Sequence, residues 1–288
     1  MSQVQKQDKF WSNLIEGAKK RTKKTIYSPY RTFNINWFQE KYYKHATKGK
    51  DYKHGYNGKE IMFTDPQAFL LSVRELFIEE IYRFKSNSPR PVILDCGAHI
   101  GMSILFFKNL YPEASIIAFE PDTHNYELTK KNIENWKYKD VGLVKKAVWI
   151  NNGIIQFNQL NDMGSSIVEG ESNIGGDVVS VECVRLKDYL VNKVDFLKLD
   201  IEGAEFAVIN DCMDKLENVE NLFIEYHGKF EEMDRLNSIL NIVVSKGFAY
   251  YIKEAGNLYN KPFVDFLTRN KIDYDVQLNI FCFRITKS

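Results

Sequence analysis

The sequence lacks an apolar run long enough to cross a membrane, because no stretch approaches the roughly 18 residues that a spanning helix needs. Its first ten residues, MSQVQKQDKF, also lack the apolar core of a signal peptide. We therefore expect a cytoplasmic protein. With 44% hydrophobic and 27% charged residues over 288 positions, the composition is that of a globular chain with one large domain and an elaboration.

Cysteine is scarce, and the four cysteines are not paired in sequence. They are Cys96, Cys183, Cys212 and Cys282, and no two of them form a C-x-x-C motif. This spacing argues against a zinc knuckle and against the disulfide framework of a secreted protein. We expect reduced, buried thiols that behave as small hydrophobic side chains.

The chain also has almost no excess of either charge, since its net charge is only +1. The charge is unevenly placed, however. Residues 1–60 hold 14 Lys and Arg against 5 Asp and Glu, whereas residues 61–288 hold 25 against 33. The two parts therefore carry +9 and −8, and this asymmetry indicates an anionic partner for the N-terminal part.

The N-terminal part combines basic and aromatic residues. Its densest basic cluster contains Lys19, Lys20, Arg21, Lys23 and Lys24. This combination suits nucleic acid, a membrane surface or stacking on sugar rings, and a solvated helix flank is the ordinary alternative. We predict a mainly helical extension over 1–85, with one helix capped by Asp65 and begun by Pro66, and a main domain over 86–288.

From residue 91 the sequence alternates between strand and helix patterns. The strand patterns are PVILDC, SIIAFEP, VGLVKKAVWI, VDFLKLD and VENLFIEYHG, and helical patterns follow several of them. An excursion, GIIQFNQL and VVSVECVRL, reads as antiparallel, and FAYYIKEAG and VQLNIFCFRI close the chain without a long helix between them. This order predicts an α/β fold with a mostly parallel sheet and an antiparallel strand near one edge.

In such a sheet, ligands bind outside the carboxyl ends of the strands. The first strand ends in LDCGAHIG, where Gly97 and Gly101 allow a tight turn that can approach a ligand closely. The spacing is neither the dinucleotide G-x-G-x-x-G nor a phosphate-binding loop with its lysine. Glu120 ends the second strand, where a carboxylate suits a pair of ribose hydroxyls.

A second constellation lies at the ends of two later strands. In LKLDIEGAE, Lys198 falls inside a central strand, so we predict that it forms an internal ion pair. Asp200 and Glu202 emerge in the loop that follows, and IEYHG places Glu225 and His227 at the next strand end. Glu205 follows just inside the next helix. These residues also have ordinary structural roles open to them: Glu205 can stabilise the N-terminus of its helix, Glu225 can pair with Lys198, and His227 can be structural.

These segments together resemble the FkbM family of S-adenosylmethionine-dependent methyltransferases, which have a Rossmann-like class I methyltransferase fold. The matching segments are ILDCGAHIGMS, IIAFEPD with Asn125 and Asn132, VKKAVW, GSSI, VRLKDYL, VDFLKLDIEGAEFAVI and LFIEYH, in the family's order across 91–230. Residues 1–85 and 257–275 carry no matching motif.

The resemblance implies a set of site residues. S-adenosyl-L-methionine would bind at Asp95, Gly97, His99, Gly101, Glu120 and Asp200. The catalytic residues would be Asp200, Glu202 and His227, with His227 or Asp200 as the base and Glu202 orienting the acceptor. No residue is assigned to a metal, although carboxylates at Asp200, Glu202 and Glu225 would also suit Mg²⁺.

The predicted activity is therefore methyl transfer to a hydroxyl of a sugar, glycan, glycolipid or related metabolite. Two alternatives stay open: an RNA methyltransferase, favoured by the basic N-terminus but disfavoured by the acidic remainder, and a non-catalytic Rossmann-like scaffold subunit. Peripheral contact with the inner membrane surface through the basic N-terminus, and formation of a homo-oligomer, are likewise left open.

Overall fold

The structure is a computed structural model of the 288-residue chain, and it describes residues 28–159, 165–167, 177–256, 258–265 and 274–285. The basic cluster at residues 19–24 lies outside these ranges. Among the described residues, no helix is both long and apolar enough to span a bilayer. The chain divides into two compact units, Met1–Ile81 and Tyr82–Ser288, which are described separately.

The first unit combines short helices with a β-hairpin. In chain order its elements are η1 (Pro29–Phe33), α2 (Trp37–His45), β1 (Tyr52–Tyr56), β2 (Lys59–Phe63), α3 (Pro66–Val73) and the π-helical η2 (Arg74–Ile78). α3 begins as predicted, because the Asp65 carboxylate accepts hydrogen bonds from the backbone N–H groups of Gln67 and Ala68. The hairpin was not predicted, and its turn places Asn57 and Gly58 in the left-handed region that two-residue hairpin loops require.

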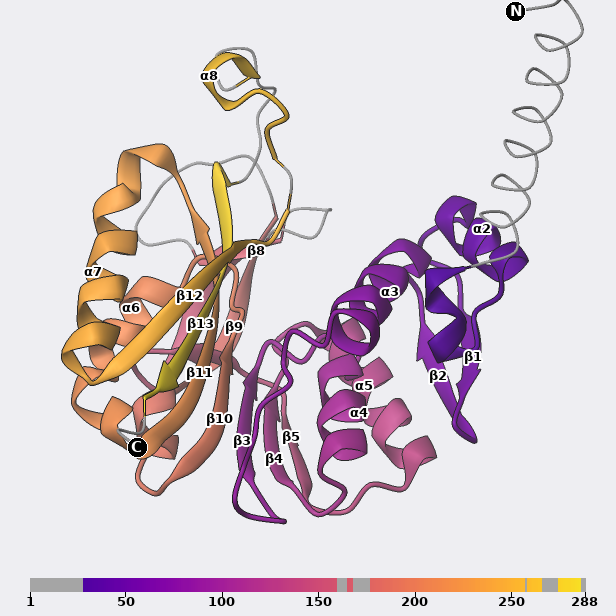
Figure 1. Ribbon diagram of the computed structural model, residues 1–288, viewed down its shortest axis with the longest axis horizontal. Helices are drawn as coiled ribbons and strands as arrows, with labels where there is room; N and C mark the ends of the chain where they lie inside the picture. Colours follow the sequence, from indigo (N-terminus) through magenta and orange to yellow (C-terminus); the bar gives the residue numbers. More distant parts are fainter. Residues whose placement is uncertain (1–27, 160–164, 168–176, 257, 266–273, 286–288) are drawn as a thin grey trace, which may run out of the picture. The chain divides into compact units, whose positions relative to one another are not determined.

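The second unit is built on a seven-stranded sheet (Figure 1) in the order β12-β13-β11-β10-β3-β4-β5. The bounds are β3 (Val92–Cys96), β4 (Ser115–Phe119), β5 (Val141–Val144), β10 (Val194–Leu199), β11 (Val219–Gly228), β12 (Phe248–Glu254) and β13 (Val276–Arg284). The strands from β11 to β5 are parallel, and β13 is antiparallel to both of its neighbours. The prediction of a mostly parallel sheet with an antiparallel strand near one edge is therefore confirmed.

Helices cover both faces of this sheet. α4 (Met102–Leu110) and α5 (Thr123–Trp136) lie on one face, and α6 (Glu205–Asp211) and α7 (Met233–Ser245) lie on the other (Figure 1). Short turns complete the unit: η3 (Leu186–Tyr189), η4 (Met213–Asn218), η5 (Phe230–Glu232) and α8 (Pro262–Asp265). The arrangement has the layers of a Rossmann-like fold, with strand ends free along one edge.

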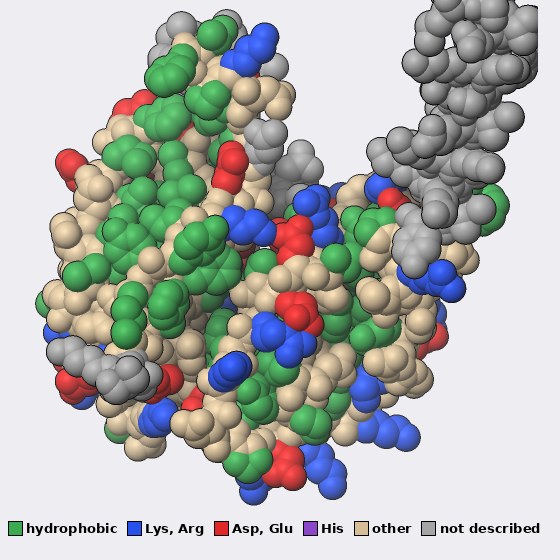
Figure 2. All heavy atoms as spheres, in the orientation of Figure 1, with side chains coloured by type: hydrophobic (Ala, Val, Ile, Leu, Met, Phe, Trp, Pro, Cys, Tyr) green, Lys and Arg blue, Asp and Glu red, His purple; other side chains and the backbone are tan. Residues whose placement is uncertain are grey.

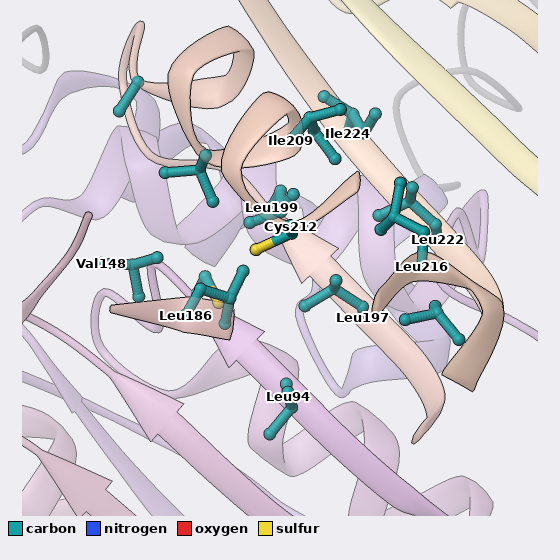
Figure 3. Packing of buried hydrophobic residues seen from close by; sticks show 14 of the residues in the cluster. Leu94, Val148, Leu186, Leu197, Leu199, Ile209, Cys212, Leu216, Leu222 and Ile224 are labelled. Carbon is teal, nitrogen blue, oxygen red and sulfur yellow. The ribbon is translucent and has the colours of Figure 1, made fainter. Parts of the chain in front are cut away.

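The largest core lies between the sheet and the helices of its second face. Figure 3 shows Leu197 and Leu199 of β10 packed with Leu222 and Ile224 of β11 and with Ile209 of α6. The alternate residues of β10 point to the opposite face, where the Phe196 ring lies 5.2 Å from that of Phe107 in α4. Because side chains alternate along a strand, Lys198 also faces away from the apolar core that contains Leu197 and Leu199.

The outer strands β12 and β13 carry exposed aromatic side chains. Figure 2 shows hydrophobic side chains gathered over this part of the sheet, and Tyr251 is 62% and Phe283 42% exposed. Each has a strand neighbour on the opposite face: the partly buried Ile252 packs against the large core, and the buried Cys282 belongs to it. The sheet therefore has a second, solvent-exposed apolar face at this edge.

The predicted antiparallel excursion forms a separate four-stranded sheet in the order β6-β9-β7-β8. Its strands are β6 (Ala147–Trp149), β7 (Gly153–Gln159), β8 (Ser165–Ile167) and β9 (Asp177–Arg185). The segment VGLVKKAVWI was predicted as one strand, but it splits after Val144. Its first half, β5, pairs with β4, whereas its second half, β6, pairs in parallel with β9.

Candidate active site

The turn after β3 adopts the backbone conformation for which its glycines are suited. Gly97 and Gly101 have φ angles of +93° and +84°, and His99 between them has φ +50°, which is uncommon for a residue with a side chain. A Cβ atom on Gly97 would overlap the backbone oxygen of Asp200. The turn therefore packs directly against the loop that follows β10, and only glycine fits at this contact.

Two buried side chains of α5 hold the turn from behind. The Thr129 hydroxyl donates to the carbonyl of His99, and the Asn132 amide donates to the carbonyl of Ile100 at 2.9 Å. Asn132 belongs to a matching segment of the sequence, whereas Thr129 was missed. Its signal was its position three residues before Asn132, on the same face of an amphipathic helix.

Glu120 lies at the end of β4, beside the same turn. One carboxylate oxygen accepts from the backbone N–H of His99 at 2.7 Å, and the other accepts from that of Asp122 at 3.0 Å. Burial raises the pKa of Glu120 to about 8, and the two N–H donors offset only part of this effect. When Glu120 is ionised, each oxygen keeps a further lone pair that can accept from a hydroxyl, and the ribose contact stays a prediction.

Asp95 is turned into the protein at the end of β3. It is fully buried, and one of its oxygens accepts a hydrogen bond from the Ser103 hydroxyl. Its other oxygen has no hydrogen-bond partner and lies 3.5 Å from Nζ of Lys198. Burial raises the pKa of Asp95, while the charge of Lys198 acts in the opposite direction. Asp95 thus supports the turn from inside the sheet.

The predicted internal ion pair of Lys198 is confirmed, and it has two carboxylate partners. Nζ lies 3.5 Å from Oδ1 of Asp95 and 3.2 Å from Oδ2 of Asp200. It also donates to the carbonyl of Gly97 at 2.6 Å and to that of Cys96 at 3.3 Å. Burial lowers the pKa of Lys198, but Asp200 and Asp95 outweigh burial and raise it. Lys198 therefore links the glycine turn to the acidic loop.

The acidic residues and His227 converge beyond Lys198. Nε2 of His227 lies 3.7 Å from Oε2 of Glu202 and 3.6 Å from Oε1 of Glu225. One side-chain nitrogen or oxygen atom from each of Asp200, Glu202 and His227 lies within 4.8 Å of the other two. The three carboxylate side chains keep 22–33% of their surface exposed, whereas the His227 side chain keeps 2%. The residues predicted to be catalytic are thus neighbours at one end of the sheet.

Glu205, at the start of α6, completes the group. Its side chain is fully buried, and Oε1 accepts from the backbone N–H groups of Ile201 at 3.2 Å and Gly203 at 3.1 Å. The same oxygen lies 3.4 Å from Nδ1 of His227. From the sequence, Glu205 could serve either the helix end or the chemistry, and its contact with His227 was not predicted because the two residues lie on different elements.

Tyr274 reaches this group from a segment in which no motif was found. Its hydroxyl donates to the backbone carbonyl of Glu202 at 3.0 Å, and its ring centroid lies 4.8 Å from that of His227. No sequence signal identified Tyr274, because its partners are about 50 and 70 residues away along the chain.

The electrostatics follow from several acids around one imidazole. Burial raises the pKa of Glu202 to about 8; the charge of His227 lowers it and that of Asp200 raises it. Burial and Asp200 also raise the pKa of Glu225. Burial lowers the pKa of His227, but its contacts with the carboxylates of Glu205 and Glu225 raise the pKa more, to well above its ordinary value.

The spacing of Asp200, Glu202 and His227 would also suit a divalent cation. Two protein cations already serve these carboxylates, however, because Lys198 is ion-paired with Asp200 and both ring nitrogens of His227 face carboxylates. An imidazole keeps a lone pair for a metal only while one of its nitrogens carries no proton. From these contacts we describe Asp200, Glu202, Glu205, Glu225 and His227 as a charge cluster and assign no metal ligand.

Comparison with known proteins gives a family match over this region. The methyltransferase FkbM domain matches residues 95–256, which include the glycine turn, Glu120, Lys198 and the charge cluster. The methyltransferase sdnD of Sordaria araneosa is 28% identical over 187 residues, covering 53% of this chain and 72% of that protein. The 2-O-methyltransferase NoeI of Sinorhizobium fredii is 27% identical over 180 residues, covering 55% and 73%.

Among solved structures, the methyltransferase FkbM of Methylobacillus flagellatus is similar with a TM-score of 0.45 at 15% identity. The alignment covers 75% of this chain and 54% of that one, so the chain spans about half the length of that protein.

Proposed function

The chain belongs to the FkbM methyltransferase family, and from this premise we propose that it is an S-adenosylmethionine-dependent O-methyltransferase. The acceptor would be a hydroxyl of a sugar, glycan or related metabolite. The observation that carries this proposal is the direct contact between two parts of the site. Gly97 packs on Asp200, and Lys198 bonds to both of their loops, so a cofactor held by the glycine turn would lie beside the acidic cluster.

The residues present fit S-adenosylmethionine. The turn from Gly97 to Gly101 offers backbone that can approach a ligand closely, and Glu120 offers carboxylate oxygens at the next strand end. His99 and Asp95 would act through the shape and support of this turn, and Asp200 would be the residue of the charge cluster that lies nearest to it. When bound, the cofactor supplies an activated methyl group on a sulfonium leaving group.

The charge cluster suits a neutral acceptor with hydroxyl groups. Asp200, Glu202 and Glu225 offer partly exposed carboxylate oxygens, which accept hydrogen bonds from hydroxyls and repel phosphates. They can orient the acceptor oxygen and receive its proton, which is typically worth about 10² to 10⁴ in rate. The name of NoeI, a 2-O-methyltransferase, supports transfer to oxygen.

The two alternatives are less well supported by this geometry. An RNA methyltransferase would bring a polyanion to a group of carboxylates, and residues 61–288 carry a net charge of −8. A scaffold subunit would have no use for partly exposed acids gathered around a buried histidine. We retain the basic extension over 1–85 as a proposed acceptor-binding or membrane-contacting element, and 86–288 as the proposed methyltransferase domain.

The first test is calorimetric titration with S-adenosylmethionine and S-adenosylhomocysteine. We expect micromolar binding, weakened at least tenfold by Glu120→Ala and unchanged by Glu134→Ala, an exposed glutamate of α5. A folded protein that binds neither ligand would contradict the proposal and favour the scaffold. After binding is shown, transfer of labelled methyl groups to a panel of glycosides and to RNA would separate the acceptor classes.

A further inference from the structure

Both ring nitrogens of His227 face carboxylates. Nδ1 lies 3.4 Å from Glu205, and Nε2 lies 3.7 Å from Glu202 and 3.6 Å from Glu225. Oε1 of Glu205 already accepts hydrogen bonds from two backbone N–H groups, so it can only accept from Nδ1, which must then carry a proton. With two further carboxyl groups within 4.0 Å of Nε2, the surrounding negative charge favours a proton on that nitrogen as well. The geometry therefore favours the imidazolium form, which cannot act as a general base.

The burial of His227 leads to the same conclusion. Its side chain is 2% exposed, whereas those of Glu202, Asp200 and Glu225 are 33%, 26% and 22% exposed. A group that receives the proton of an acceptor hydroxyl must lie within hydrogen-bond reach of it. The carboxylates meet this condition, and the imidazole lies behind them.

Glu205 lies on the far side of the imidazole from the exposed carboxylates. It is fully buried, and within the described part of the chain His227 is the cationic side chain found within 4.0 Å of it. A buried carboxylate needs a paired charge and hydrogen bonds, and Oε1 of Glu205 has both, because it also accepts from the N–H groups of Ile201 and Gly203. Its Oε2 is buried and has no hydrogen-bond partner among the described residues, which makes the contact with His227 more important. Ile201 and Gly203 flank Glu202 in the loop.

The backbone of Glu202 is consequently fixed on three sides. Glu205 bonds to the residue before it and to the residue after it, and the Tyr274 hydroxyl donates to its own carbonyl. Glu202 has φ +54°, a left-handed conformation that a side-chain-bearing residue keeps only when its surroundings hold it there. The loop thus presents the most exposed carboxylate of the cluster in one defined position.

We propose that Glu205 is a positioning residue that keeps His227 as an imidazolium, and that Glu202, held by this pair, takes the proton of the acceptor. The role of Glu202 rests on the proposed methyl transfer, whereas the charge of His227 is independent of it. As the acceptor oxygen bonds to the methyl carbon and the carbon–sulfur bond breaks, the hydroxyl proton passes to the Glu202 carboxylate. The sulfur leaves as a neutral thioether, so charge and atoms balance.

Glu202 suits this role better than the neighbouring acids. Asp200 is ion-paired with Lys198 at 3.2 Å, so its carboxylate is already engaged with a buried cation. Glu225 lies on the same strand as His227 and is the least exposed of the three. The raised pKa of Glu202, about 8, supports this assignment because a base is most effective when its pKa lies near the working pH.

Among the described residues, three elements bring acidic or aromatic side chains to His227, and a fourth group comes from its own strand. Glu205 faces it from α6, Glu202 and Asp200 from the loop after β10, and Glu225 from its own strand, while the Tyr274 ring packs at 4.8 Å. Lys198 is the other nearby cation and is paired with Asp95 and Asp200. Four carboxylates and one phenol ring thus surround a single imidazole.

The charge of His227 can be measured without knowing the acceptor. The chain has five histidines, so nitrogen-15 NMR of the imidazole rings gives a readable spectrum, with His227 assigned from the signal lost in His227→Gln. We expect both nitrogens of His227 to keep imidazolium shifts at a pH of about 7.5, where an ordinary histidine with a pKa of about 6.5 is mostly neutral. A neutral tautomer of His227 at that pH would overturn the proposal.

Glu205→Gln tests the positioning role, and Glu217→Gln, an exposed site in η4, is the matched control. Loss of the buried charge should lower the titration midpoint of His227 by at least one pH unit, a tenfold change in proton affinity, while the control leaves it unchanged. An unchanged midpoint in folded Glu205→Gln would refute the role. If that variant does not fold, Glu225→Gln, at a partly exposed site, should lower the midpoint in the same direction.

Two further measurements separate this inference from its alternatives. S-adenosylhomocysteine should bind Glu205→Gln within about threefold of wild type, because Glu205 does not touch the proposed cofactor turn; if wild type itself does not bind, the proposed function fails while the His227 result stands. Micromolar Mn²⁺ should leave the His227 signals sharp. Selective broadening of those signals would identify a metal site and overturn the imidazolium assignment.

Discussion

Lys198→Met is expected to destabilise the protein strongly and in a pH-dependent manner. The substitution preserves much of the side-chain volume and removes the cation that lies 3.5 Å from Asp95 and 3.2 Å from Asp200. Asp95 is fully buried, and its Oδ1 has no hydrogen-bond partner to replace the ion pair. Breaking a buried pair on one side typically costs about 3–5 kcal/mol, so we expect a loss of that size at neutral pH.

The sign of the pH dependence follows from Asp95. Its pKa is already raised by burial in the native protein, and removing Lys198 raises the pKa further. A carboxyl whose folded pKa exceeds its unfolded value of about 3.9 favours the folded state at low pH, and this contribution is lost as pH rises through the folded pKa. The deficit of Lys198→Met should therefore be larger at pH 7.5 than at pH 5.

Guanidinium unfolding of the full-length variants measures this deficit, and two further variants define its origin. Lys193→Met, at a 67% exposed lysine just before β10, should cost less than about 1 kcal/mol. Asp95→Asn combined with Lys198→Met should recover much of the loss, because both members of the pair are then uncharged. A Lys198→Met deficit below about 1 kcal/mol, or a double variant as unstable as the single one, would refute the reasoning.

Three other predictions concern the cofactor and the cluster. S-adenosylhomocysteine should bind more tightly as pH rises through about 8, since ribose donors favour the ionised form of Glu120, and calorimetry should find this dependence absent in Glu120→Gln. Gly97→Ala should abolish binding or folding, because Gly97 has φ +93° and the added Cβ would overlap the backbone of Asp200. Gly142→Ala, whose Cβ would lie 3.9 Å from its nearest neighbour, should bind normally, and equal behaviour of the two variants would contradict the packing argument. Asp200→Asn should keep its circular dichroism spectrum and lose about 10²-fold in methyl transfer, because its contact with Lys198 positions the acidic loop beside the glycine turn, and wild-type turnover would remove Asp200 from the mechanism.

The sequence was most informative where a local pattern sufficed. The alternation in VDFLKLD separates Lys198 from the apolar face of β10, and its burial then required a charged partner. The order of strands and helices likewise predicted where the site residues gather. In contrast, the break between β5 and β6 depends on which strands they pair with, and those partners lie in two different sheets.

Residues that were missed in the site act through contacts that are distant in sequence. For Glu205 the sequence left a helix-end role and a chemical role open, and its contact with His227 joins α6 to β11. Tyr274 contacts the backbone of Glu202 from the C-terminal part of the chain, and no periodicity reports such a contact. Thr129 differs, since its spacing from Asn132 places both on the helix face that meets the glycine turn.

The two buried basic side chains of the site are surrounded by acids in the same arrangement. Lys198 lies between Asp95 and Asp200, and His227 lies between Glu205 and the pair Glu202 and Glu225. In each case the cation is paired with a fully buried acid on one side and a partly exposed acid on the other. The buried acid keeps the cation charged, and the cation in turn fixes the exposed acid. Because Lys198 also bonds to the glycine turn, one charge network connects the proposed cofactor site with the carboxylates that would meet the acceptor.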